Sequence, residues 1–225
     1  MDRPFIITQS IYKLNCPPIR VHPIHESNLT QTLVQQFLDA VPTNGAVGVA
    51  PLYDRFFNLT AIALSAPERV LLVHLNTKAE HPRPRKGKNN ASGRELLANL
   101  ILCSERYTKY ALFMDLVALS LFFNHRLRIS HAVDLQDAVQ DGRGSVAALV
   151  SIAGGEAMLN KANLTRLFVN DENEGVPIAD LALQAWFLGR AASSAKLEMR
   201  VKHVVRIHTN LLSDVVRFLL FFLGY

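Results

Sequence analysis

The stretch from Tyr107 to Ala138 constrains the fold of this chain more than any other part of the sequence. It begins with an apolar run that carries one acid, Asp115, and continues with apolar residues at helical spacing. A second apolar run, residues 127–133, follows and ends on Asp134. A strand, an acid, a helix, a strand and a second acid in this order are typical of the middle of an α/β domain.

Three apolar segments before this stretch predict strands at residues 46–51, 59–64 and 70–75. The connectors between them are short and hold turn residues, so we expect an antiparallel meander. Helical spacing predicts helices at residues 29–38 and 93–103 and through most of residues 141–225. The sequence thus predicts an α/β fold: a mixed sheet of three antiparallel strands and then parallel strands, flanked by helices, with a helical C-terminal part.

We expect an N-terminal lead-in at residues 1–26 and a single domain at residues 27–225. The whole chain of 225 residues carries a net charge of +5 and has a pI near 9.4, which permits contact with nucleic acid or an anionic membrane. Its two cysteines, Cys16 and Cys103, lie far apart without metal-site spacing, so we expect a reducing compartment, the cytoplasm or the nucleus. The first residues, MDRPFIITQS, do not match a secretory signal, and no apolar segment approaches the ~20 residues that span a bilayer, so we expect no membrane contact.

Three antiparallel strands, a βαβ unit and trailing helices resemble the RNase H-like order of the DEDD-type 3′–5′ exonucleases, the RNase D-like group. The segment GAVGVAPLYDRFFNLTAIALSAPERVLLVHL resembles the family's first motif region. The segment RELLANLILCSERYTKYALFMDLVALSLFFNHRLRISHAVDLQDA resembles its next helix, its "Lys-apolar" strand, its acid-bearing helix start and the strand after it, which typically reads "apolar-x-Asp-x-Gln". The resemblance covers roughly residues 27–140.

Catalysis in this family uses two divalent ions held by four carboxylates. Carried over by motif, the Asp-x-Glu pair falls at Ala50 and Leu52, which cannot bind a metal, and the second-motif acid falls at Asp115. The last motif, Tyr-x-x-x-Asp or His-x-x-x-x-x-Asp, is expected within AWFLGRAASSAKLE, where Ser194 or Leu188 stands instead of an acid. The resemblance therefore implies a catalytically degenerate exonuclease-like domain without a metal or other cofactor. Inactive relatives of this fold act as RNA-binding adaptors, so it also implies an RNA-binding or protein-interaction module rather than an enzyme.

Two other readings of the acids remain open. Asp115 can be a structural N-cap of a helix that begins at Leu116. Alternatively, the chain can be an active 3′–5′ exonuclease that uses Mg²⁺ or Mn²⁺ with relocated acids, which would be drawn from Asp54, Asp115, Asp134, Asp137 and Asp180.

Two segments are candidates for binding partners. The polar loop at residues 76–93 contains five basic residues that can contact the phosphates of a nucleic acid, or simply be solvated: Lys78, Arg83, Arg85, Lys86 and Lys88. The apolar segment from Val215 to Tyr225 is expected to be buried, or else to contact a protein partner or a second copy of the chain. The third functional hypothesis is accordingly a structural protein that oligomerises through this segment.

Overall fold

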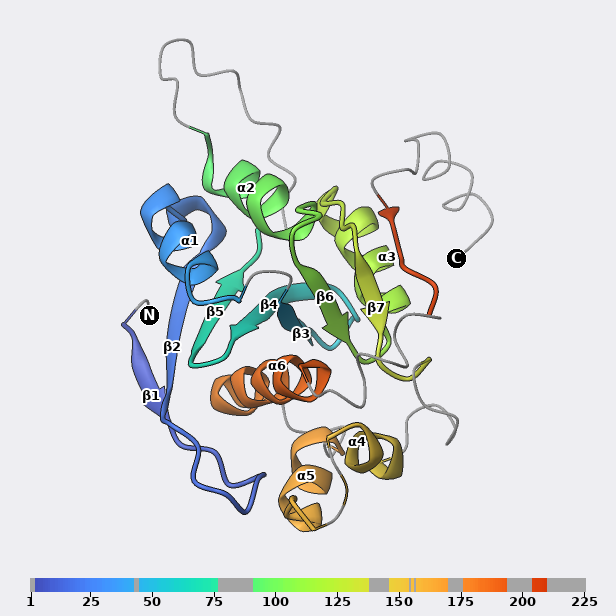
Figure 1. Ribbon diagram of the computed structural model, residues 1–225. Helices are drawn as coiled ribbons and strands as arrows, with labels where there is room; N and C mark the ends of the chain where they lie inside the picture. The colour runs from blue at the N-terminus through green and yellow to red at the C-terminus, as the bar shows by residue number, and fades with distance from the viewer. Residues whose placement is uncertain are drawn as a thin grey trace.

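A seven-stranded mixed sheet forms the centre of the molecule (Figure 1). The computed structural model describes residues 3–42, 45–76, 91–137, 146–153, 155, 157–169, 176–193 and 204–209. The strand order across the sheet is β1-β2-β5-β4-β3-β6-β7. The strands are β1 (Phe5–Ile7), β2 (Ile19–His25), β3 (Ala46–Tyr53), β4 (Leu59–Ala66), β5 (Arg69–His74), β6 (Thr108–Ala111) and β7 (Ala132–Asp134).

The strand pairing confirms the predicted mixed sheet. β3, β4 and β5 form an antiparallel meander, β6 lies parallel to β3, and β7 lies parallel to β6. The strand predicted at residues 127–133 is shorter than expected, because only Ala132–Asp134 pairs with β6. Arg126 and His131 have φ angles of +52° and +49°, and these turns keep the intervening residues out of the sheet.

The predicted lead-in contributes two strands to the same sheet. β2 lies parallel to β5 with Pro23 opposite Leu72, and β1 pairs with β2 in antiparallel fashion. Val21 and Ile19 are fully buried in the core that β5 also lines. The described part of residues 1–26 is therefore an integral part of the domain.

Helices cover both faces of the sheet (Figure 1). One face carries α1 (Gln31–Leu38), α2 (Gly93–Leu96), which continues as a π-helical segment at Leu97–Leu102, and α3 (Met114–His125). The other face carries α4 (Val146–Ile152), α5 (Lys161–Phe168) and α6 (Ile178–Ala192). The alternation along β5 explains both layers, because Val70 and Leu72 face α6 whereas Leu71 and Val73 face the layer that holds α1, α2 and α3. None of the helices in the described ranges is long and apolar enough to cross a membrane.

Two glycines bring α6 directly onto β3. A Cβ atom added at Gly48 would overlap the Ala185 carbonyl oxygen, and one added at Gly189 would lie 2.5 Å from the Ser65 hydroxyl oxygen. The Ser65 hydroxyl donates to the Ala185 carbonyl at 2.8 Å and accepts from the Gly48 N–H at 3.1 Å. This hydroxyl therefore joins β3, β4 and α6 at one point.

Residues 204–209 return to the sheet at its β7 edge. Ile207 forms an antiparallel bridge with Ala132, and the Thr209 N–H donates to the Ile129 carbonyl at 2.9 Å. The backbone of this segment thus covers part of an edge strand whose hydrogen-bonding groups would otherwise face solvent.

Candidate functional site

The candidate site lies where three strands end. β3, β6 and β7 are parallel to one another, so their carboxyl ends lie at the same edge of the sheet. Ligands of open α/β sheets bind at this edge. α3 begins here as well, because β6 ends at Ala111 and α3 starts at Met114.

On β3, two apolar side chains stand at the positions where motif spacing in the sequence predicts the two acids of the first motif. Ala50 is buried in the core beneath α6, with 1% of its surface exposed, and Leu52 is half-buried beside the same core. Neither side chain has an oxygen or nitrogen atom. The end of β3 therefore offers no ligand for a divalent ion at these two positions.

Asp115 is exposed in the first turn of α3, near the end of β3. One turn further along α3, the Ser120 hydroxyl donates to the Tyr53 hydroxyl at 3.4 Å. Burial raises the pKa of Tyr53, and the nearby charge of Asp115 raises it further, although the contact with Ser120 acts in the opposite direction. Asp115 therefore lies on the same side of α3's first turns as the end of β3, within electrostatic reach of Tyr53.

Asp134, rather than Asp115, caps α3. Its Oδ2 accepts from the Met114 N–H at 3.0 Å, and its Oδ1 accepts from the Gln136 N–H at 2.9 Å. The predicted role of Asp115 as an N-cap is wrong, because α3 begins before it, with Phe113 in the N-cap position. Burial raises the pKa of Asp134, its two backbone hydrogen bonds oppose this shift, and the charges of Asp137 and Asp115 add to it.

Two further candidate acids have positions that local structure explains. Asp54 lies in the turn between β3 and β4, where its carboxylate accepts hydrogen bonds from Phe56 and Asn58. Asp180 lies in the first turn of α6, a favourable place for an acid at the start of a helix. Within the described part of the chain, no three His, Cys, Asp or Glu residues are grouped so that they could hold a metal ion.

The metal pair of the resembling family does not fit these residues. Ala50 and Leu52 offer no ligand atoms, and both carboxylate oxygens of Asp134 already accept backbone N–H groups. Among the described residues, Asp115 is the only acid at a position that motif spacing predicts for a metal ligand. A single carboxylate does not make a site for divalent ions, which take several oxygen ligands.

α6 packs across β3 in an orientation that the sequence did not reveal. Gly48 contacts both Ala185 and Gly189, whereas Ala46, at the start of β3, lines a cavity of about 380 Å³ together with Gly189 and Ser193. The preceding turn of α6, with Leu181, therefore lies toward the carboxyl end of β3. Leu181 and Ala185 are one turn apart and fully buried, with 0% of each exposed. The sequence did not point to Leu181, because motif spacing predicts that the last motif begins at Ala185 or later.

Several predicted residues lie outside the described ranges. They are Ser194, the basic residues Lys78, Arg83, Arg85, Lys86 and Lys88, and the apolar segment from Val215 to Tyr225.

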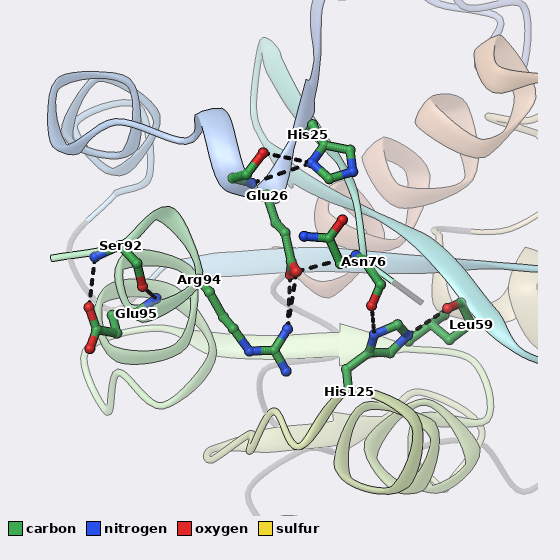
Figure 2. A network of polar contacts seen from close by, with 9 residues as sticks. His25, Glu26, Leu59, Asn76, Ser92, Arg94, Glu95 and His125 are labelled. Carbon is green, nitrogen blue, oxygen red and sulfur yellow. Dashed lines mark hydrogen bonds and ion pairs between the residues drawn. The ribbon is translucent and has the colours of Figure 1, made fainter. Parts of the chain in front are cut away.

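Residues on either side of the basic segment, residues 77–90, are described, and one buried carboxylate binds two of them. Glu26 is 2% exposed; its carboxylate accepts from the Asn76 N–H at 3.2 Å and from the Arg94 guanidinium at 3.1 Å (Figure 2). The His125 ring extends this network, because its two nitrogens lie 3.1 Å from the Asn76 carbonyl oxygen and 2.6 Å from the Leu59 carbonyl oxygen (Figure 2). Glu26 therefore binds Asn76 and Arg94, which lie on either side of residues 77–90 in the sequence, close to His125 at the C-terminus of α3.

Comparison with known proteins identifies the fold. No family model matches this sequence, and no curated protein matches it either. The EXO domain of Aedes aegypti Nibbler has a TM-score of 0.51 at 14% identity, over 81% of this chain and 89% of that one. A structure described as the apo form of the nuclease has a TM-score of 0.50 at 14% identity, over 81% and 82%.

Escherichia coli RNase D, an exoribonuclease involved in structured RNA processing, has a TM-score of 0.50 at 16% identity. The match covers 80% of this chain and 45% of RNase D. Likeness at such low identity establishes a shared fold and leaves function to the residues of the site. This chain has the RNase H-like fold of the DEDD-type 3′–5′ exonucleases, the RNase D-like group that its sequence resembles.

Proposed function

We propose that this protein is a catalytically degenerate 3′–5′ exonuclease-like domain that binds single-stranded RNA. The observation that carries the proposal is the pair of apolar residues, Ala50 and Leu52, at the carboxyl end of β3, where the family's first motif has its two acids. RNA is favoured over DNA because RNase D, which shares the fold, is described as an exoribonuclease.

The position of α6 supports the same proposal. The family's last motif spaces its acid four residues after a tyrosine, which is one helical turn. Two buried pairs of α6 have this spacing and pack toward β3, Leu181 with Ala185 and Ala185 with Gly189, and none of these residues has a side chain that can bind a metal. With the first of these pairs the acid position of the motif is Ala185, about one to three helical turns before Leu188 or Ser194, and with either pair it still carries no carboxylate.

Affinity would come from positive charge rather than from metal ions. The basic segment offers Lys78, Arg83, Arg85, Lys86 and Lys88 to the phosphates of a single strand. Asn76 before this segment and Arg94 after it bind the same buried carboxylate of Glu26. Such contacts are independent of base sequence and weaken as salt is added.

The test uses the whole chain and a 5′-labelled single-stranded RNA. We expect retention of the RNA in filter binding at low salt, and no shortening of its 3′ end with Mg²⁺ or Mn²⁺. Trimming that needs a divalent ion and disappears in Asp115→Ala would establish the alternative, an active exonuclease with relocated acids. Absence of salt-sensitive binding, together with a dimer that dissociates when residues 213–225 are deleted, would favour the structural, oligomerising protein.

A further inference from the structure

The turn between β3 and β4 presents two adjacent phenylalanines to solvent. Phe56 is 68% exposed and Phe57 is 84% exposed, and they follow Arg55 in the sequence. Single exposed apolar residues are common on protein surfaces, so exposure by itself indicates nothing. The conformation of this turn is what distinguishes the pair.

The turn is braced by Asp54. Its Oδ1 accepts from the Phe56 N–H at 2.8 Å and from the Asn58 N–H at 2.9 Å, and its carbonyl oxygen accepts from the Phe57 N–H at 3.0 Å. Hydrogen bonds from Asn58 hold the pKa of Asp54 below its ordinary value, so the carboxylate stays charged at neutral pH. The two rings therefore project from a preorganised backbone.

Phe57 occupies a position that suits glycine. Its φ angle is +60°, in the left-handed region that ends many three-residue hairpin loops, where glycine is usual. A bulky side chain in this region is strained. The Phe57 ring is almost fully exposed and so contributes little packing in return. Strained residues of this kind cluster at functional sites, because the fold alone gives no reason to keep them.

Arg55 and the position of the turn complete the surface. The Arg55 guanidinium lies 4.7 Å from the centre of the Phe56 ring, over one face of it. The turn follows Tyr53, whose hydroxyl contacts Ser120 of α3, so it adjoins the candidate site at the carboxyl end of β3. A cation beside exposed aromatic rings is the combination that binds single-stranded nucleic acid: the rings stack on bases and the cation attracts phosphate.

We propose that Arg55, Phe56 and Phe57 form a stacking site for the bases of single-stranded RNA. This inference rests on the proposed function and adds to it a second, aromatic set of contacts distinct from the basic segment. Every base has an aromatic face, so the site tolerates any sequence. Loss of one stacked base weakens binding by about 5-fold to 150-fold.

The experiment measures binding of the whole chain to a single-stranded RNA that carries 2-aminopurine, whose fluorescence is quenched when it stacks. Wild-type protein is expected to quench the probe as it binds. Phe56→Leu keeps an apolar side chain but removes the aromatic face, so affinity and quenching should fall; Phe56→Trp should retain both. Phe57→Asn should weaken binding while leaving Tm unchanged or higher, because asparagine adopts positive φ more readily.

Ile6→Ala is the matched control, since Ile6 is 65% exposed on β1, an edge strand that β2 and β5 separate from β4. If wild-type protein binds RNA and Phe56→Leu and Phe57→Asn bind with unchanged affinity and quenching, the stacking site is refuted while the proposed function stands. Equal losses in Phe56→Leu and Phe56→Trp would also refute stacking. If wild-type protein binds no RNA at any salt concentration, the proposed function itself fails.

Discussion

At the scale of single residues, Gly48 and Gly189 allow a helix and a strand to touch through their backbones. The Gly48 contact is with a carbonyl oxygen of α6, which cannot move without shifting the helix. The Gly189 contact is with the Ser65 hydroxyl, which is a removable side-chain atom. The two glycines therefore differ in how their substitution can be relieved.

We predict that Gly48→Ala and Gly189→Ala each lower the free energy of unfolding by about 1–3 kcal/mol or more, because an added methyl group overpacks the α6–β3 contact. Adding Ser65→Ala should recover part of the loss in Gly189→Ala and little of the loss in Gly48→Ala. Urea unfolding of the single and double variants measures both effects. Equal recovery in the two backgrounds would contradict the assignment of the clashing atoms.

Lys109 is a buried cation on β6, with no exposed surface. Its Nζ donates to the Ser104 carbonyl at 2.6 Å and to the Tyr107 carbonyl at 2.8 Å. Burial lowers the pKa of Lys109 to about 8, and the neighbouring Cys103 and Glu105 act in the opposite direction. The side chain is thus held by neutral carbonyl groups rather than by a close carboxylate.

This shift predicts a pH dependence of stability. Between pH 8 and 10.5 the unfolded chain holds the Lys109 proton more tightly than the folded one, so the free energy of unfolding rises with pH, by at most about 1.4 kcal/mol per pH unit. Lys109→Met should remove this rise, whereas Met in place of the exposed Lys13 should leave it intact. Denaturant titrations across this range measure the difference, and parallel curves for wild type and Lys109→Met would contradict it.

At the scale of elements, the start of α3 depends on a residue from another strand. Asp134 at the end of β7 accepts the Met114 N–H, so the cap joins β7 to α3 across the candidate site. Asparagine offers one acceptor oxygen where the carboxylate offers two. We predict that Asp134→Asn lowers the free energy of unfolding by about 1–2 kcal/mol, through the loss of one buried backbone partner. Urea unfolding measures the change.

Asp115→Asn is the matched control for the cap. Asp115 is exposed, and its carboxylate accepts only the N–H of the next residue, Leu116, among the bonds described for it. We expect the free energy of unfolding of Asp115→Asn to stay within about 0.5 kcal/mol of the wild-type value, as for most surface substitutions. A larger loss in Asp115→Asn than in Asp134→Asn would restore the sequence-based assignment of the cap.

The elements that sequence patterns predicted well are those with continuous apolar runs. β4 and β5 are buried on both faces, and their apolar composition follows directly from that burial. β2 was harder to predict because Pro23 is typical of an edge or an irregular segment, yet β2 pairs on both sides. The cap of α3 could not be predicted, because Asp134 is distant from Met114 in sequence and a cap is normally sought next to the helix.

At the scale of the whole molecule, the proposed function predicts how RNA affinity responds to salt. For single strands, the logarithm of the binding constant falls with the logarithm of salt concentration by about 0.7 for each phosphate contacted. Replacing Arg83, Arg85 and Lys86 with glutamine should reduce this slope by about 0.7 for each phosphate that is no longer neutralised. Filter binding over a series of salt concentrations measures it.

Glutamine in place of Arg3, which is exposed before β1, serves as the control for net charge. An unchanged slope in the triple variant would remove the basic segment from the interface, whatever the affinity of the protein. Stacking on Phe56 and Phe57 should contribute to affinity without changing the slope, since stacking releases no counterions, whereas a phosphate contact made by Arg55 would add to the slope.

The assignment of Ala50, Leu52 and Asp115 to the candidate site came from motif spacing and stays a prediction. The structure joins the end of β3 to α3 through Tyr53 and Ser120. The position of the last motif depends on which face of α6 packs against β3, and two glycines that are far apart in sequence set that face. The sequence did not predict the stacking site at Arg55, Phe56 and Phe57, because its distinguishing property is the positive φ of Phe57, a backbone conformation that a sequence does not display.

The carboxylate of Glu26 also bears on how this protein can change over evolution or be engineered. It fixes Asn76 and Arg94 independently of what connects them, so the connection can be lengthened, shortened or exchanged while both anchors keep their partners. The entropy of closing a loop grows slowly, by about 0.6 kcal/mol for each doubling of its length. Residues 77–90 are therefore the natural place to graft a different binding peptide, or a whole folded domain, onto this scaffold.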